Sequence, residues 1–280
     1  MRLVLLITFF VLSGCARLFF HPDKNYVLTP QELHVSYQDF YFKASDGTRL
    51  HGWFLPAHEE SVATVLFLHG NAQNISTHIA SVYWLTERRF DVFLLDYRGY
   101  GASQGRPSFD GIHADAEAAL QYLVEKMDAD SKALVVFGQS LGGAVAIRMV
   151  ANSPYRHKIK ALIVEGAFAS YPQIAREKLA ELWLTWPLQW IPYATVSGAY
   201  DAVKAVANVS PIPLVIIHGN ADPIIPPAHA YCLYRAALQP KELWMVPGGG
   251  HIEAFSKPAC RERLVRYLRK LAEEDHRQDR

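Results

Sequence analysis

Short apolar runs recur along the chain, and polar residues do not alternate within them. They lie at Val62–Gly70, Val92–Leu95 and Ala133–Phe137, and within the segments KIKALIVEGAF, IPLVIIHGNADPIIPP and KELWMVPGGGHIE. Such continuous runs are typical of strands that are buried on both faces. Helical patterns separate the runs. The pattern therefore predicts an α/β fold with a mostly parallel sheet and helices on both faces.

The remaining patterns set the limits of the domain. Two alternating runs flank Ser45–Thr48, where Asp-Gly favours a hairpin, so the sheet should gain an antiparallel edge. Helical patterns cover Asp110–Met127 and Cys260–Glu274. The chain has 280 residues, of which 50% are hydrophobic, and this is enough for one large core. We expect one domain over residues 37–274 and a frayed tail at 275–280.

A serine stands between glycines where a predicted strand meets a predicted helix. The segment Gly138-Gln139-Ser140-Leu141-Gly142 follows the apolar run that ends at Phe137 and begins an alanine-rich helical pattern. A strand that enters a helix directly must turn sharply, and glycine relieves the crowding around the turn. The helix N-terminus beside the hydroxyl favours negative charge. The segment predicts a nucleophile elbow with Ser140 as the nucleophile.

A serine hydroxyl also needs a base and an acid that orients the base. Asp222 and His251 each follow a predicted strand, where catalytic groups of parallel sheets lie. The chain order serine, aspartate, histidine is the one expected for a nucleophile elbow. We predict Ser140, Asp222 and His251 as a catalytic triad. Glu165, at the end of another strand, is the alternative orienting acid, or else a hydrogen-bond partner in the loop or lid.

Two N–H groups are needed to stabilise the oxyanion of an acyl-transfer intermediate. The backbone of Leu141, directly after the nucleophile, is the first candidate. The second is Asn71, in the loop after the strand that ends in His69-Gly70. We interpret His69 as a residue that holds this loop by hydrogen bonds.

The stretch between Gly166 and Pro211 contains no run typical of a core strand. We predict a small helical lid over residues 167–210. Its tryptophans Trp183, Trp186 and Trp190 are predicted to line an apolar pocket for the acyl part of a substrate. The alternative is that these rings only pack the lid against the core.

The N-terminus has the pattern of an export signal. Arg2 precedes the apolar run Leu3–Leu12, which is too short to span a bilayer comfortably, and Leu-Ser-Gly-Cys ends at Cys15. This end resembles the lipobox of bacterial lipoproteins. We expect a signal peptide at 1–14, lipid on Cys15 and a tether at 15–36. The expected location is the cell envelope, at the outer membrane of a diderm bacterium. A plain signal peptide, giving a periplasmic or secreted protein, or an uncleaved anchor are the alternatives.

Composition excludes several other classes of function. The formal net charge is +1, so no basic excess points to nucleic acid. Three cysteines and twelve histidines show no metal-ligand spacing, and we expect neither a metal nor a cofactor. The expected partners are a small-molecule or lipid acyl substrate and, through the lipid anchor, a membrane.

The chain resembles the α/β-hydrolase superfamily, and more narrowly the BEM46-like serine hydrolases. The resemblance runs from about Tyr37 to Leu271, on the motifs FLHGNA, LLDYRGYGASQGRPS, GQSLGG, IIHGNADPIIP and GGGHIE. It implies an α/β-hydrolase fold and structural, loop-anchoring roles for Asp96, Arg98 and Gly99. The lipobox is not a general feature of that group.

These observations predict a serine hydrolase that cleaves an ester, thioester or amide through an acyl-enzyme. A carboxylesterase is the first expectation. A peptidase or thioesterase on the same triad is the alternative among enzymes. A non-catalytic envelope lipoprotein that uses the fold as a binding module is the alternative from another class.

Overall fold

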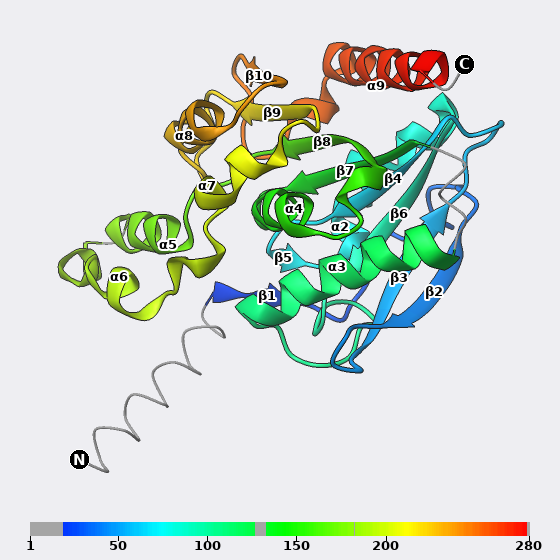
Figure 1. Cartoon of the computed structure of the whole chain (residues 1–280). Helices are drawn as coiled ribbons and strands as arrows, with labels where there is room; N and C mark the ends of the chain where they lie inside the picture. Colours follow the sequence, from blue (N-terminus) through cyan, green and yellow to red (C-terminus); the bar gives the residue numbers. More distant parts are fainter. Residues whose placement is uncertain (1–18, 127–132, 182, 279–280) are drawn as a thin grey trace.

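The sheet that carries the candidate site has eight strands. In the computed structural model, which describes residues 19–126, 133–181 and 183–278, they follow the spatial order β10-β9-β8-β7-β4-β6-β3-β2 (Figure 1). The strands are β2 (Gln38–Lys43), β3 (Arg49–Leu55), β4 (Ala63–Leu68), β6 (Phe90–Asp96), β7 (Ala133–Gln139), β8 (Ile159–Glu165), β9 (Leu214–Gly219) and β10 (Lys241–Val246). β3 runs antiparallel to β2 and to β6, and all other neighbours are parallel. The predicted α/β class and the antiparallel hairpin at one edge are confirmed.

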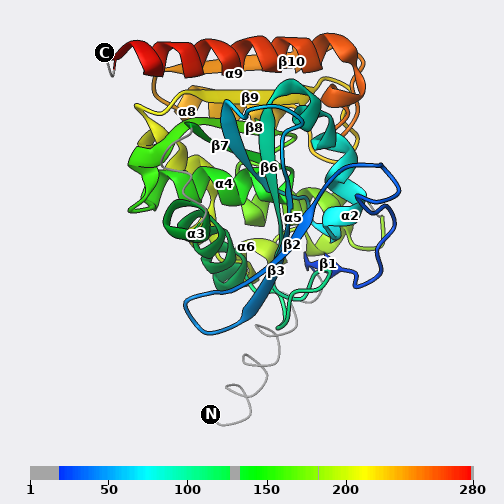
Figure 2. The same cartoon turned by 90° about the vertical axis from the view of Figure 1, so that its right-hand side faces the viewer.

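Helices cover both faces because alternate residues of the central strands enter two separate cores. In β4, Leu66 and Leu68 belong to one core, whereas Val65 and Phe67 belong to the other. Figure 2 shows α3 and α4 on one side of the strands and α2 on the other. The first core includes residues of α3 (Phe109–Lys126), α4 (Leu141–Asn152), α7 (Ala202–Ala205) and α8 (Ala228–Ala236). The second includes residues of α2 (Ile75–His78), η1 (Ile79–Ser81), η2 (Tyr83–Arg88), η8 (Ala254–Ser256) and α9 (Pro258–Gln278).

A helical insert joins β8 to β9 and occupies the region predicted as a lid at 167–210. Its elements are α5 (Tyr171–Ala180), η5 (Trp186–Leu188), α6 (Ile191–Thr195), η6 (Gly198–Tyr200), α7 and η7 (Val206–Val209). α7 and η7 pack against α4, whereas α5 and α6 pack on each other and project from the body of the domain (Figure 1). That the insert acts as a lid stays a prediction.

The segment before β2 differs from the tether predicted at 15–36. From Phe19 onward it lies on the domain, where β1 (His21–Pro22) pairs in parallel with β5 (Ala72–Gln73). Phe20 is buried in the first core. The carbonyl of Asp23 accepts a hydrogen bond of 3.1 Å from Nδ2 of Asn74. Contacts of this kind use backbone and polar groups, so no apolar periodicity predicts them.

The C-terminal helix is longer than the sequence pattern indicates. α9 continues through Gln278, so residues 275–278 of the predicted frayed tail are helical, and only 279 and 280 lie outside the described residues. Among the helices that the structure describes, none has the length and apolar character needed to cross a membrane.

Candidate active site

Ser140 occupies the turn between β7 and α4 in a strained backbone conformation. Its φ of 52° and ψ of −115° place a non-glycine residue at positive φ, which carries a conformational cost. A Cβ at Gly138 would lie 2.3 Å from the carbonyl oxygen of Gly142, and a Cβ at Gly142 would lie 2.0 Å from that of Leu68. Glycine is therefore required at both positions by close backbone approach, as expected for an elbow.

Two neighbouring strands hold the elbow in place. The N–H of Ser140 donates to the carbonyl of Glu165, at the end of β8, over 2.8 Å. On the β4 side, a Cβ at Gly70 would lie 3.5 Å from that of Ser140 and 2.9 Å from Cε1 of His78. A side chain at residue 70 would therefore crowd the ring of His78, whereas its contact with Ser140 would be an ordinary one.

His251 and Asp222 form a hydrogen-bonded pair beyond the ends of β10 and β9. Nδ1 of His251 lies 2.7 Å from Oδ2 of Asp222. The other oxygen, Oδ1, accepts from the N–H groups of Ile224 and Ile225 at 2.8 and 2.9 Å. Burial opposes ionisation of Asp222, but the hydrogen bonds from His251 and the two amides outweigh it and lower the pKa of this carboxyl. The carboxylate is therefore fixed in both position and charge.

Glu165, the alternative orienting acid, has other partners. Its Oε2 accepts from Nε2 of Gln139 at 2.7 Å, and its Oε1 accepts from the N–H of Ala254 at 2.8 Å. The side chain is buried, and burial raises its pKa to about 7. Glu165 thus connects Gln139, the residue before the nucleophile, to Ala254, which follows His251 by three residues. The carboxylate that binds the imidazole is that of Asp222.

The imidazole of His251 also lies against the strand end that holds the serine. A Cβ at Gly166 would lie 3.1 Å from Cε1 and 3.2 Å from Nδ1 of His251. Gly166 directly follows Glu165, whose carbonyl binds the N–H of Ser140. The backbone of Glu165 and Gly166 therefore borders both Ser140 and His251, and the three residues predicted as a triad lie at the same carboxyl edge of the sheet.

The loop after β4 carries the second predicted oxyanion donor. The side chain of Asn71 is engaged elsewhere: Nδ2 donates to the carbonyl of Phe19 at 2.5 Å, and Oδ1 accepts from the hydroxyl of Tyr100 at 3.1 Å. The group that remains as a candidate is its backbone N–H. Leu141, the first predicted donor, begins α4, where N–H groups have no intrahelical acceptor.

His69 anchors this same loop, in agreement with its sequence interpretation. Its ring is fully buried, and Nδ1 lies 2.7 Å from the carbonyl oxygen of Gly70. Burial, followed by the nearby His78, lowers its pKa well below the usual value. A neutral imidazole bonded to the loop backbone is a structural group.

Sequence reasoning missed that the N-terminal segment borders the site. The ring of Phe19 lies 5.6 Å from that of Tyr171 and 6.4 Å from that of Phe168, at the base of the insert. Its carbonyl binds Asn71, as described above. The only signal in the sequence is the pair of aromatic residues Phe19-Phe20 after the apolar leader.

The predicted substrate-binding tryptophans lie at the surface of the insert. Trp183, Trp186 and Trp190 are 86, 64 and 66% exposed. This exposure disfavours the alternative that they only pack the lid against the core. Their contact with an acyl group stays a prediction, and Cys15 lies outside the described residues.

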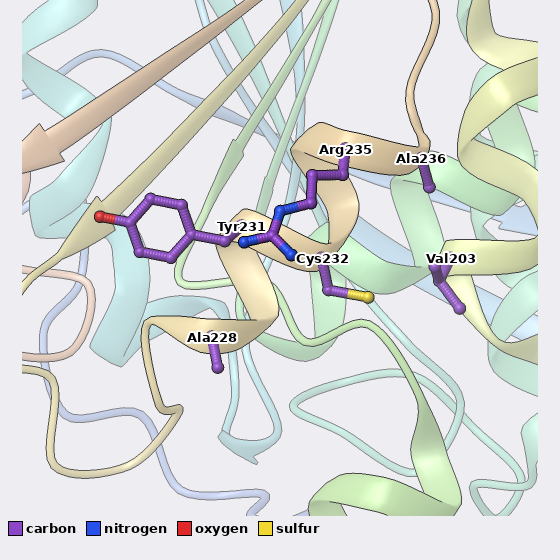
Figure 3. A pocket seen from close by; sticks show the side chains of 6 residues that line it. All are labelled: Val203, Ala228, Tyr231, Cys232, Arg235 and Ala236. Carbon is purple, nitrogen blue, oxygen red and sulfur yellow. The ribbon is translucent and has the colours of Figure 1, made fainter.

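A separate surface depression lies on α8. Its volume is about 540 Å³, and Figure 3 shows the lining side chains, Val203, Ala228, Tyr231, Cys232, Arg235 and Ala236. None of the triad residues borders it. It is therefore distinct from the candidate active site.

Comparisons with known proteins agree with this architecture. A model of the family described as serine aminopeptidase, S33, matches residues 59–209. The uncharacterized protein YfhR of Escherichia coli K12 is 38% identical over 94% of this chain and 93% of its own length. The α/β-hydrolase domain-containing protein WAV2 of Arabidopsis thaliana is 35% identical over 92% of this chain and 86% of its own. Protein bem46 of Schizosaccharomyces pombe is 30% identical over 76% and 69%. The chain therefore belongs to the α/β-hydrolase superfamily, as a BEM46-like member.

Solved structures show the same fold. The esterase Pf2001 of Pyrococcus furiosus matches with a TM-score of 0.71 at 20% identity, over 91% of this chain and 98% of that one. Acetyl xylan esterase 1 of a Thermoanaerobacterium species matches with a TM-score of 0.62 at 18% identity, over 82% and 81%. At such identities the likeness establishes the fold, and the choice of substrate is a separate question.

Proposed function

We propose that this α/β hydrolase is a serine hydrolase that cleaves carboxylic esters through an acyl-enzyme. The observation that carries the proposal is the strained Ser140 at a strand-to-helix turn, at the same sheet edge as the His251–Asp222 pair. Strain of this kind persists only where the surrounding structure imposes it, and it is concentrated at functional sites. The esterases among the solved structures with this fold make an ester the first substrate to test.

In the proposed mechanism, Asp222 holds Nδ1–H of His251 and so leaves Nε2 as the base. Nε2 takes the proton of the Ser140 hydroxyl as its oxygen attacks the substrate carbonyl. The tetrahedral oxyanion accepts hydrogen bonds from the backbone N–H groups of Leu141 and Asn71. Its collapse expels the alcohol, which receives the proton from His251. A water molecule, deprotonated by the same imidazole, then attacks the acyl-enzyme. The second tetrahedral intermediate releases the carboxylic acid, and the imidazolium returns its proton to the serine oxygen.

Ester turnover by matched variants tests this mechanism. Purified protein should hydrolyse p-nitrophenyl esters from the acetyl to the palmitoyl series, and Ser140→Ala should lower kcat by roughly 10³-fold or more with an unchanged melting temperature. Cys232→Ser, an exposed position away from the triad, serves as the control and should retain full activity. Aminoacyl p-nitroanilides and acyl thioesters, assayed in parallel, distinguish an esterase from a peptidase or a thioesterase. Activity that persists in Ser140→Ala would refute the role of the serine.

We also propose that the chain is anchored to the bacterial envelope by lipid on Cys15. The support is the sequence alone: a basic residue, the apolar run Leu3–Leu12 and the Leu-Ser-Gly-Cys end occur in the order that lipoproteins require. Several acyl chains at one residue provide stable anchoring without a spanning helix. The wild-type protein should fractionate with membranes and carry acyl groups on an N-terminal Cys15. Cys15→Ser should remain an unprocessed precursor. A soluble wild-type protein with a free N-terminus beyond Cys15 would contradict the proposal.

A further inference from the structure

The projecting part of the insert exposes an unusual concentration of large apolar side chains. We call these residues the cap patch, and each is between 42 and 86% exposed: Trp183, Leu184, Trp186, Leu188, Trp190 and Tyr193. The chain's other three tryptophans, Trp53, Trp84 and Trp244, are at most 5% exposed. Grouped apolar exposure on a soluble domain marks a surface that binds something else.

The chemistry of the cap patch favours a lipid surface as its partner. Residues 182–200 contain no Asp, Glu, Lys, Arg or His, so the patch is continuous in sequence and uncharged. Tryptophan and tyrosine are the residues enriched where proteins meet the boundary between water and lipid, because one end of each ring system is apolar and the other is polar. A pocket for one acyl chain would bury such rings rather than expose them.

The described chain begins on the same side of the molecule as the cap patch. Phe19, the first described residue, packs against Tyr171 at the start of α5 and binds the oxyanion loop through Asn71. β1 and α6 lie toward the same side of the molecule in both views (Figures 1 and 2). The chain therefore enters the domain at the base of the insert.

The segment before Phe19 contains the proposed anchor, only a few residues away. Cys15, the proposed lipid attachment site, stands four residues before Phe19, and the apolar run Leu3–Leu12 precedes it. Four extended residues reach at most about 14 Å. In a chain anchored as proposed, through lipid on Cys15 or through the apolar run itself, the base of the insert is held near the bilayer. A second copy of the chain could also cover the cap patch, but it would not explain why the anchor emerges beside it.

We propose that the cap patch docks on a lipid bilayer and turns the catalytic edge of the sheet toward the membrane surface. This inference rests on the proposed anchoring and is independent of the proposed hydrolase activity. The tryptophans then contact lipid outside the domain.

The full-length protein itself contains the probes for a test, because three of its six tryptophans lie in the cap patch. It is reconstituted into phosphatidylcholine–phosphatidylglycerol vesicles whose acyl chains are either plain or dibrominated, and the vesicles are collected by flotation. Bromine quenches only tryptophans in contact with the acyl region. Brominated vesicles should reduce the fluorescence by about a half, because three exposed rings enter the interface and three buried rings do not.

Variants of the cap patch test whether its tryptophans are the ones that the brominated lipid quenches. Trp183→Ser should lower it part way, and the triple change at Trp183, Trp186 and Trp190 should nearly abolish it. Leu238→Ser, which removes an exposed apolar residue outside the insert, should leave it unchanged. The single variant keeps the test valid if the triple variant is unstable.

Four results would overturn the inference. Floated wild-type protein with equal fluorescence in both vesicle types would refute docking and leave the anchor intact, whereas protein that does not float would refute both. Quenching of the triple variant as strong as that of wild type would place the contact elsewhere. Shielding of the cap tryptophans from acrylamide that grows with protein concentration in the absence of vesicles would identify a second copy as the partner.

Discussion

Ser140 and its glycine neighbours show how single residues build the candidate site. The serine adopts a positive φ that most side chains avoid, and the segments around it leave no space for a Cβ at positions 138 and 142. Backbone atoms, which cannot move aside like a flexible side chain, make the closest approaches. The position of the Ser140 hydroxyl thus depends on the absence of a side chain at positions 138 and 142.

Gly142→Ala tests this dependence. Its Cβ would lie 2.0 Å from the carbonyl oxygen of Leu68, so the elbow must shift. We expect loss of ester turnover together with a destabilisation of about 3 kcal/mol, at the upper end of the range typical of overpacked sites. Gly248→Ala is the control: it meets no atom within 4 Å and adds only the cost of its positive φ, about 1 kcal/mol. Both turnover and urea unfolding should be measured. Equal effects of the two changes would mean that backbone contact does not shape the elbow.

Glu165 makes stability depend on pH in a defined direction. Burial raises its pKa from the ordinary 4.5 to about 7, so the folded state binds the proton more tightly than the unfolded chain. The contribution of Glu165 to stability is fully present below pH 4.5 and is lost as pH rises through about 7. Glutamine copies the protonated carboxyl, so the free energy of unfolding of wild type should fall by about 3 kcal/mol relative to Glu165→Gln between these limits. Urea unfolding of both proteins from pH 4 to 8 measures this difference in free energy. A difference that does not change with pH would contradict the raised pKa of Glu165.

At the scale of elements, the loop after β6 is fastened to α3 by one buried ion pair. Arg98 donates through Nε and Nη2 to Asp115 at 2.7 to 3.0 Å, and its own N–H donates to the same carboxylate. Nη1 reaches Asp46, in the β2–β3 turn, at 2.7 Å. This geometry agrees with the loop-anchoring role that the family resemblance implies for Arg98.

Asp115→Ala should therefore destabilise the domain strongly. It leaves a mostly buried guanidinium without its main partner, a change that costs roughly 3–5 kcal/mol. Asp46, the second partner of the same guanidinium, is exposed to solvent. Asp46→Ala should therefore lower the free energy of unfolding much less. Thermal or urea unfolding of the two variants decides the point. Losses of equal size would show that burial does not determine the strength of these ion pairs.

At the scale of the whole molecule, the sequence predicts those features that depend on apolar periodicity or on order along the chain. Continuous runs predict the buried strands, and the positions of Asp222 and His251 after two of them predict their meeting. The packing of residues 19–36 on the domain is not predictable in this way, since it depends on contacts such as Asn74 with Asp23 that join distant polar groups. The exposure of Trp183 is not predictable from the apolar pattern either, because a pattern of apolar residues predicts burial.

The proposed nucleophile can be tested most directly by labelling with a fluorophosphonate probe, which reacts with a serine only when its base and oxyanion donors are in place. We predict one adduct, located by mass spectrometry on Ser140. Labelling should be absent in Ser140→Ala, slowed by orders of magnitude in Asp222→Asn and far less affected in Glu165→Gln. An adduct on another serine, or a Glu165→Gln variant that is crippled while Asp222→Asn reacts normally, would contradict it.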